Sequence, residues 1–368
     1  MIAMVDLKTQ NAALDKEITS GIHSVLASGQ FLFGPQVAAF EEEAADYLGS
    51  RHAISCASGT DALMLSLRAL DIGPGDEVIT TPFSFFATVE AILLTGATPV
   101  FVDIHPRSFN LNPALVEQAI TEATKAILPV HLFGQPADME LLRSIAIHHE
   151  LYLVEDCAQS FGASCTAGVT GTLGNTGCFS FFPSKNLGAC GDGGLITTQD
   201  DQLAARLRSL CNHGSHKRHC HEMTGYNSRL DEFQAVVLRA KLRRIDRYNE
   251  ARRHWARYYT QSLADMSSLI TPRQDQYSCH VFNQYTLLLS QRDYVYEALQ
   301  EQQIGCAIHY PIPLYRQPAL EPLFPDLCLP VVEEVSAHCL SLPMHPELTQ
   351  QQADEVILTL RQTLAQIG

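Results

Sequence analysis

The chain has 368 residues, of which 46% are hydrophobic and 18% are charged, a balance typical of globular proteins with a buried core. Acidic residues outnumber basic ones by 40 to 25, and the resulting net charge of −15 argues against sequence-independent nucleic-acid binding. No apolar run reaches the roughly 18 residues that a membrane-spanning helix needs, and the first residues lack the apolar core of a signal peptide. Eleven scattered cysteines indicate reduced thiols in a cytoplasmic protein.

Strand-like and helical patterns alternate between residues 53 and 198. Apolar runs predict strands at 53–57, 77–81, 99–102, 126–131, 152–155, 178–182 and 194–198. Helical patterns fit between them, for example at 60–70, 86–94, 113–120 and 139–149. Such an alternation is typical of a mostly parallel sheet with helices on both faces, which binds ligands beyond the carboxyl ends of its strands.

The last third of the chain has a different organisation. A long helical pattern at 230–259 predicts a connection between two domains. Beyond it, a strand at 284–289, a helix near 294–303 and a final helix from residue 349 flank a proline-rich segment that we expect to form loops. We therefore expect a large domain over residues 1–245 and a smaller C-terminal α+β domain over residues 246–368.

Lys185 occupies an unusual position for a lysine. It follows the apolar run at 178–182, and glycines lie just beyond it. Taken alone, a lysine after a strand is more often a surface residue in a loop. Lysines are almost never fully buried unless they are paired, and a buried lysine can lose its proton and act as an amine nucleophile. The chemistry most often built on such an amine is a Schiff base with pyridoxal phosphate.

Asp156 follows a second apolar strand and lies 29 residues before Lys185. Apolar residues on both faces indicate that this segment is a central parallel strand. A carboxylate at the carboxyl end of such a strand can pair with the protonated pyridine nitrogen of pyridoxal phosphate, which keeps the ring an electron sink. The two residues together favour a pyridoxal phosphate site over a surface lysine.

A third segment fits the phosphate of that cofactor. Residues 55–63 have the pattern of a strand end, a turn of small residues and a helix start. Free backbone N–H groups and the helix dipole make such a helix N-terminus an anion site. Thr60 and Asp61 are by themselves ordinary helix-capping residues. Combined with Asp156 and Lys185, the segment predicts a phosphate-binding turn.

The chain resembles the sugar aminotransferase family named after DegT, DnrJ, EryC1 and StrS, which has the aspartate aminotransferase architecture, fold type I of the pyridoxal phosphate enzymes. The motifs that carry the resemblance cover nearly the whole chain in the family's order. They lie at 58–63, 73–79, 82–88, 96–103, 155–160, 180–185, 225–229 and 309–311. The resemblance implies an α/β fold, with a mostly parallel, mixed seven-stranded sheet between helices and a smaller C-terminal domain.

The resemblance also implies a role for residues around the cofactor. Lys185 corresponds to the lysine that forms the Schiff base with pyridoxal phosphate and later shuttles the proton. Asp156 corresponds to the partner of the pyridine nitrogen, and Gln159 to the residue near the phenolic oxygen. Phe85 corresponds to the aromatic residue that stacks on the ring; its alternative is a core position beside Phe83 and Phe86.

The phosphate of the cofactor has its own set of matching residues. Gly59, Thr60 and Ser180 correspond to the family's phosphate contacts. Asn227 corresponds to a residue that the neighbouring subunit contributes to the phosphate. The resemblance therefore implies a homodimer with shared active sites.

The substrate contacts follow from two further segments. Arg229 is expected to clamp a phosphate or a carboxylate, because a guanidinium binds either group through two donors. His309 and Tyr310 lie in a segment that resembles the family's nucleotide-sugar contact. This segment is more similar to the branch that aminates C3 of keto sugars, including a 3-keto glucuronic acid branch used in O-antigen sugars, than to the C4 branch.

The resemblance implies an aminotransferase that moves an amino group from L-glutamate to a keto sugar of a UDP- or dTDP-linked sugar, with pyridoxamine phosphate as the intermediate form of the cofactor. Amination at C4, or of a non-nucleotide keto compound such as an aminocyclitol or aromatic precursor, is the open alternative. A dehydratase on the same scaffold is disfavoured, because such relatives replace the lysine with histidine. The Asp156–Lys185 pair disfavours a purely regulatory protein, and the glycine spacing after Lys185 disfavours an NAD site.

One cluster of potential metal ligands is set aside. Cysteines and histidines are frequent at 211–221, but their spacing matches no established zinc pattern. We expect solvated loop histidines there and no metal site.

Overall fold

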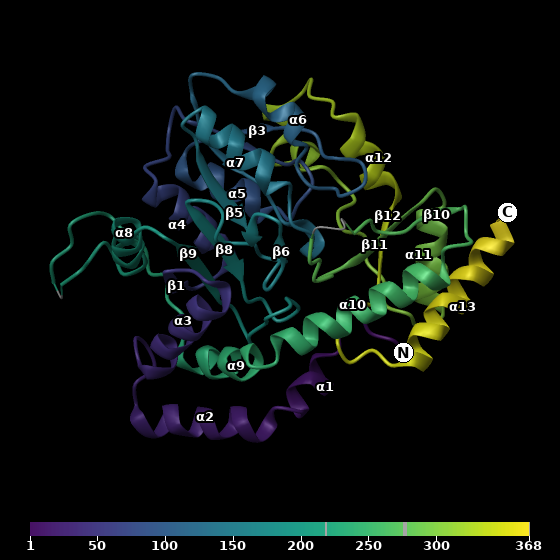
Figure 1. The fold of residues 1–368 in the computed structure, drawn as a ribbon, viewed down its shortest axis with the longest axis horizontal. Coiled ribbons are helices and arrows are strands. Elements are labelled where there is room, and N and C mark those ends of the chain that lie inside the picture. The colour runs from purple at the N-terminus through teal and green to yellow at the C-terminus, as the bar shows by residue number, and fades with distance from the viewer. Residues whose placement is uncertain (218, 275–277, 368) are drawn as a thin grey trace.

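The computed structural model describes residues 1–217, 219–274 and 278–367. Its centre is a seven-stranded sheet with the strand order β1-β9-β8-β5-β4-β2-β3 (Figure 1). Strands β8, β5, β4, β2 and β3 run parallel, whereas β9 runs opposite to its neighbours β8 and β1. The mostly parallel mixed sheet is confirmed. Its strands are β1 (His52–Cys56), β2 (Glu77–Thr80), β3 (Thr98–Phe101), β4 (Thr124–Leu128), β5 (Tyr152–Asp156), β8 (Thr176–Ser180) and β9 (Gly194–Thr198).

Helices cover both faces of this sheet because successive strand residues point to opposite sides. Leu153 and Val154 are adjacent on β5, yet they are buried in different cores. Val154 lies in the core under α4 (Gly59–Ala69), α5 (Ala87–Thr95) and α8 (Asp201–Cys211). Leu153 lies in the core under α6 (Pro113–Val116) and α7 (Met139–His148), and α3 (Pro35–Leu48) and α9 (Glu232–Leu242) continue that side of the sheet.

A second sheet organises the C-terminal region. It is antiparallel and contains β10 (Leu269–Ile270), β11 (Tyr285–Leu289) and β12 (Cys339–Leu342). Its core includes Ile2, which pairs with Ile304, so the start of the chain packs against this region. The surrounding helices are α10 (Ile245–Ser262), α11 (Arg292–Glu301), α12 (Pro330–His338) and α13 (Gln350–Ile367), and α1 (Leu7–Ala12) and α2 (Asp15–Ser28) precede the large sheet.

The single helix expected at 230–259 is wrong. The chain forms two helices there, because α9 ends at Leu242 and α10 begins at Ile245. The break lets α9 pack along α2 and α3, while α10 crosses toward α13 (Figure 1). Neither glycine nor proline occurs at the break, so the sequence gives no local signal for it.

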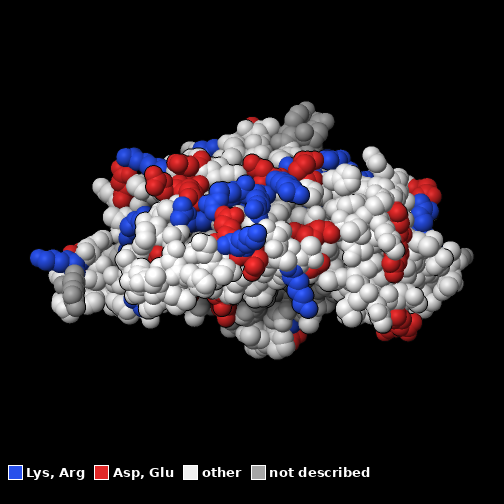
Figure 2. Space-filling view, turned by 90° about the horizontal axis from the view of Figure 1, so that it is seen from below, with Lys and Arg blue, Asp and Glu red and all other residues white. Residues whose placement is uncertain are grey.

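Charged side chains of both signs share the face shown in Figure 2, which views the molecule from below, where α2 and α9 lie in Figure 1. Arg239 pairs with Glu43, and Arg243 pairs with Glu17. The arginines of α9 and α10 are therefore interleaved with carboxylates and do not form a continuous basic patch. None of the helices in the described part of the chain has the length and apolar character needed to cross a bilayer.

Candidate functional site

A cavity of about 520 Å³ lies at the carboxyl ends of the parallel strands. It is lined by the end of β5, the N-terminus of α4, the loop after β8 and residues of the C-terminal region. The structure thus brings together segments that are up to about 250 residues apart in the chain. Of the residues predicted from the sequence, the cavity wall contains Gly59, Thr60, Phe85, Asp156, Gln159, Ser180, Lys185, His309 and Tyr310.

Asp156 is held rigidly at the end of β5. Its Oδ1 accepts the backbone N–H of Ala158 at 3.1 Å, and its Oδ2 accepts the hydroxyl of Thr88 at 2.8 Å. Burial raises the pKa of this carboxyl above its ordinary value, and the two hydrogen bonds together with the charge of Lys185 oppose that rise. A cation placed against this carboxylate would find a fixed, desolvated negative partner.

Lys185 lies across the same cavity in a tight turn after β8. Its backbone N–H donates to the carbonyl of Phe182 at 2.9 Å. Burial lowers the pKa of its ammonium to about 8, although the charge of Asp156 acts in the opposite direction. A substantial fraction of the amine is therefore neutral near physiological pH, as a nucleophilic lysine requires.

The N-terminus of α4 meets the end of β8 at very close range. Ser58 caps the helix, because its Oγ accepts the N–H of Asp61 at 3.1 Å. A Cβ on Gly59 would lie 2.6 Å from the Cβ of Ser180, so only glycine permits this approach. The first N–H groups of the helix remain directed at the cavity end, where helix geometry favours an anion.

The aromatic residues of segment 82–88 have distinct environments. Phe83 is fully buried in a core of other aromatic side chains, whereas Phe85 is 60% exposed and lines the cavity. The alternative of a core position for Phe85 is therefore wrong. An exposed ring at the cavity wall is well suited to cover the face of a planar ligand.

The C-terminal region closes the cavity through Tyr310, which contacts Gln159 just beyond the end of β5. Gln159 Nε2 donates to the hydroxyl of Tyr310 at 3.2 Å, and Gln159 Oε1 accepts the N–H of Phe133 at 2.6 Å. His309 contacts Ser341 Oγ at 3.2 Å, and burial lowers the pKa of its imidazole. These contacts connect the loop at 309–310 to the end of β5.

Asn227 and Arg229 are not brought to this cavity by their own chain. Arg229 lines a separate hollow of about 410 Å³, where its guanidinium lies 5.7 Å from the centre of the Phe33 ring. Its guanidinium also donates to Oδ1 of Asn227. A contribution of either residue to the cavity therefore requires a second copy of the chain, and both roles stay predictions.

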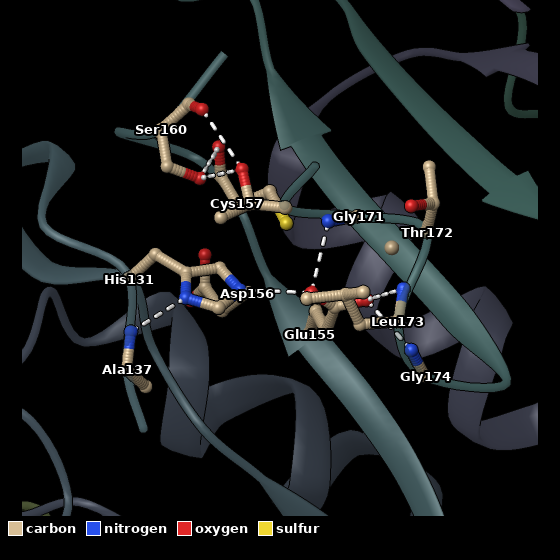
Figure 3. Close-up of polar contacts among 12 residues, drawn as sticks. His131, Ala137, Glu155, Asp156, Cys157, Ser160, Gly171, Thr172, Leu173 and Gly174 are labelled. Carbon is tan, nitrogen blue, oxygen red and sulfur yellow. Dashed lines mark hydrogen bonds and ion pairs between the residues drawn. The ribbon is translucent and has the colours of Figure 1, made fainter. Parts of the chain in front are cut away.

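Glu155 and His131 are both buried and hold in place the end of β5, where Glu155 directly precedes Asp156 (Figure 3). Glu155 accepts the N–H groups of residues 171, 173 and 174 at 2.8–2.9 Å. It also contacts Nε2 of His131 at 3.0 Å, and the N–H of Ala137 donates to Nδ1 of the same ring. Because Nδ1 accepts, Nε2 carries the proton and donates to Glu155.

This group is not arranged as a metal site, although Cys157 brings a third potential ligand within 4.8 Å. Both ring nitrogens of His131 and both oxygens of Glu155 are already engaged in hydrogen bonds (Figure 3). The histidines and cysteines of 211–221 do not form a group of three neighbouring ligand atoms in the described part of the chain.

Sequence reasoning overlooked Thr88 and Ser84. Ser84 Oγ lies 2.8 Å from Thr88 Oγ1, and Thr88 gives its single hydroxyl proton to Asp156, so Ser84 donates to Thr88. Both residues lie in a motif of the resemblance, but nothing local links them to a carboxylate 68 residues away. Ser184, Asp192 and Asn283 also line the cavity without having been predicted.

The cavity fits pyridoxal phosphate on structural grounds. The close approach of Gly59 to Ser180 puts the N-terminus of α4 at the cavity wall, where a phosphate can bind. The fixed carboxylate of Asp156 suits a pyridinium, and Lys185 supplies an amine of lowered pKa. These three groups line one cavity together with the exposed ring of Phe85. Each part of the cofactor thus has a matching group on this chain.

Comparison with known proteins decides the family. The family model described as the DegT/DnrJ/EryC1/StrS aminotransferase family matches residues 12–361. The chain belongs to this family. It is a pyridoxal phosphate-dependent aminotransferase with the fold type I architecture, as the resemblance implied.

Two curated relatives and one solved structure are similar over nearly the whole chain. A UDP-N-acetyl-3-dehydro-α-D-glucosamine 3-aminotransferase of Acidithiobacillus ferrooxidans is 48% identical, covering 99% of this chain and 98% of the relative. A UDP-2-acetamido-2-deoxy-3-oxo-D-glucuronate aminotransferase of Pseudomonas aeruginosa is 44% identical, covering 95% and 96%. The crystal structure of S. venezuelae DesV in complex with a ketimine intermediate has a TM-score of 0.96 and 42% identity, covering 98% of each chain.

Proposed function

We propose that this aminotransferase moves an amino group from L-glutamate to the C3 keto carbon of a nucleoside-diphosphate sugar. The observation that carries the proposal is the pairing of Lys185 and Asp156 across one cavity, in a chain 48% and 44% identical to aminotransferases named for UDP-linked 3-keto sugars. UDP-linked 3-keto N-acetylglucosamine and its glucuronic acid counterpart are the first substrates to test. Products of this kind would serve amino-sugar and surface polysaccharide biosynthesis, including lipopolysaccharide O-antigen.

Each cavity residue has a proposed part in the reaction. Bound pyridoxal phosphate supplies an electron sink for the carbon that loses its proton. Lys185 Nζ would take that proton and return it at the second carbon of the 1,3-transfer, for which its pKa of about 8 is well placed. Asp156 keeps the pyridine nitrogen protonated, and the α4 N-terminus with Gly59, Thr60 and Ser180 holds the phosphate. Phe85 and Gln159 line the same cavity, where Phe85 would cover a face of the ring and Gln159 would contact its phenolic oxygen.

The substrate is proposed to bind between two subunits. His309 and Tyr310 line the cavity of their own chain, whereas Arg229 lines a separate hollow and donates a hydrogen bond to Asn227. A homodimer in which Asn227 and Arg229 of one subunit complete the site of the other would account for this separation. Sedimentation or light scattering should then give twice the monomer mass, and a monomeric, fully active enzyme would contradict the shared site.

Two further assignments go with this proposal. We place the division between a large and a small domain at residues 245 and 246, where α10 leaves the large sheet and enters the C-terminal core. We also assign the protein to the cytoplasm, because all eleven cysteines are free thiols in the structure.

The first test is the absorption spectrum of the purified protein with pyridoxal phosphate, before and after addition of L-glutamate. Loss of the cofactor's visible band together with formation of 2-oxoglutarate supports the first half of the reaction. Mass spectrometry of a UDP-linked 3-keto sugar added next should show conversion to the amine. A cofactor band that ignores L-glutamate would refute the donor, and unchanged turnover in Lys185→Ala would refute the role of that lysine.

A further inference from the structure

Three buried asparagines join the turn that carries Lys185 to α10 and to the cavity wall. Asn186 directly follows Lys185, Asn249 lies on α10, and Asn283 lines the cavity just before β11. Their exposed fractions are 4%, 1% and 3%. Burial of three amides is unfavourable unless their polar atoms are hydrogen-bonded, so their arrangement requires a physical explanation.

Backbone carbonyls fix the direction of every hydrogen bond among these amides, because a carbonyl only accepts. Asn186 Nδ2 donates to the carbonyl of Val281 at 3.0 Å and to Oδ1 of Asn249 at 2.7 Å. Asn249 Nδ2 donates to the carbonyl of Phe161 at 3.0 Å, and Asn283 Nδ2 donates to Oδ1 of Asn186 at 2.9 Å. Reversing the Asn186 or Asn249 amide would set an oxygen against a carbonyl oxygen, so the network has one orientation.

The backbone around the three amides is also tightly constrained. The turn after β8 is so compact that a Cβ on Gly188 would lie 2.3 Å from the carbonyl of Pro183. On the opposite side, the N–H of Asn283 donates to the carbonyl of Phe133 at 2.8 Å, and the N–H of Phe133 donates to Gln159. Asn186 therefore connects the Lys185 turn to a wall that is itself tied to the end of β5.

We propose that Asn186, Asn249 and Asn283 are positioning residues that set the distance between Lys185 and the opposite wall of the cavity. The proposal rests on the proposed function, in which Lys185 Nζ carries a proton between two carbons. Such a transfer is sensitive to position, since a misplacement of about 1 Å can cost roughly a hundredfold in rate. Asn186 and Asn249 hold the turn of Lys185 from outside the cavity, and Asn283 ties them to the cavity wall.

Asn249 is the best residue for the test, because it belongs to the network and does not line the cavity. Asn249→Leu removes both of its hydrogen bonds, whereas Asn249→Asp keeps the acceptor for Asn186 and loses only the N–H donor to the carbonyl of Phe161. The control is Val356→Ala in α13, a fully buried core residue of the C-terminal region whose apolar side chain takes no part in the amide hydrogen bonds. Thermal unfolding identifies how much stability each variant loses.

The measured quantities are the single-turnover rate with L-glutamate, followed by loss of the cofactor band, and the KM for L-glutamate. We expect Asn249→Leu to lower the rate about tenfold to a hundredfold and to leave KM within about twofold. Asn249→Asp should have a smaller loss, and Val356→Ala should react at the wild-type rate despite its lower melting temperature.

The proposal fails if both Asn249 variants react at the wild-type rate, or if Val356→Ala is slowed equally. If Asn249→Leu does not fold, the comparison of Asn249→Asp with Val356→Ala decides, and a wild-type rate for the former overturns the proposal. Failure of the proposed function is recognised separately, because the wild-type protein itself would then not react with L-glutamate.

Discussion

The hydroxyl of Thr88, on the first turn of α5, donates a 2.8 Å hydrogen bond to Oδ2 of Asp156, at the end of β5. It is one of two hydrogen bonds that oppose the rise of the carboxyl pKa caused by burial. The contact thereby keeps negative charge where the proposed function requires a partner for the pyridine nitrogen.

Replacement of Thr88 by valine preserves the shape of the side chain and removes this donor. The pKa of Asp156 should rise, so the acidic limb of the pH–rate profile should move to higher pH. Loss of a hydrogen bond to a charged group should lower the rate with L-glutamate about tenfold or more at pH 7. Thr95→Val is the control, because Thr95 is also buried on α5 but donates only to the carbonyl of Ile92 among the described contacts. Equal effects of the two substitutions would contradict the role of Thr88.

The amine of Lys185 should capture pyridoxal phosphate with a pH dependence centred near 8. The ammonium does not react, and the pKa is lowered from 10.5 to about 8 by burial, so capture by the cofactor-free protein should speed up as pH rises through 8. At pH 7 about one-tenth of the amine is then neutral, against roughly one in three thousand for an ordinary lysine.

The same lysine links folding stability to pH. The unfolded chain keeps the ordinary pKa and binds more protons than the folded chain between about pH 8 and 10.5, so this group adds stability as pH rises through that window.

In Asp156→Asn the midpoint of cofactor capture by Lys185 should fall, because the charge of Asp156 raises the pKa of the lysine. Stopped-flow absorbance gives the capture midpoints of the wild type and of Asp156→Asn. An unchanged or higher midpoint in the variant would refute the electrostatic effect of Asp156 on Lys185.

A methyl group at position 59 should weaken cofactor binding. In Gly59→Ala the new Cβ would lie 2.6 Å from the Cβ of Ser180, which forces the α4 N-terminus away from the end of β8. We expect at least about a tenfold rise in the dissociation constant for pyridoxal phosphate, measured by fluorescence titration of the cofactor-free protein. Gly73→Ala is the matched control, since its Cβ would be 3.5 Å from the nearest atom. Unchanged affinity in Gly59→Ala would show that the close approach is not needed for the phosphate.

Glu155 should matter for stability and not for cofactor contact. Glu155→Gln sets an N–H₂ group against backbone N–H donors in a fully buried position (Figure 3), which should cost about 3 kcal/mol of unfolding free energy. Denaturant unfolding measures this loss. Glu140→Gln, at an exposed position of α7, should lie within about 0.5 kcal/mol of the wild type. A neutral result at Glu155 would mean that the 171–174 loop finds other acceptors.

Sequence patterns and the family resemblance were enough to predict the sheet and the cofactor, and they singled out Lys185 and Asp156 as candidate residues for it. Strand patterns were readable because both faces of a central parallel strand are buried, and this makes the segments at 152–154 and 178–182 largely apolar. Asp156 was recognisable as a charge at the carboxyl end of its strand, and Lys185 as a charge in the short turn that follows the apolar run at 178–182. Gly59 was singled out only in combination with Asp156, Lys185 and the family resemblance, because small residues are also common at ordinary helix starts.

The tertiary structure alone decided which groups support those residues. Thr88 meets Asp156 across 68 residues, and Asn186 meets Asn283 across 97, through the packing of α5 on the sheet and the path of α10. Short polar side chains have no periodic pattern that predicts such partners. The sequence also did not predict the break between α9 and α10, or the position of Arg229 outside the cavity. Packing between distant elements, and not local preference, sets where those segments lie.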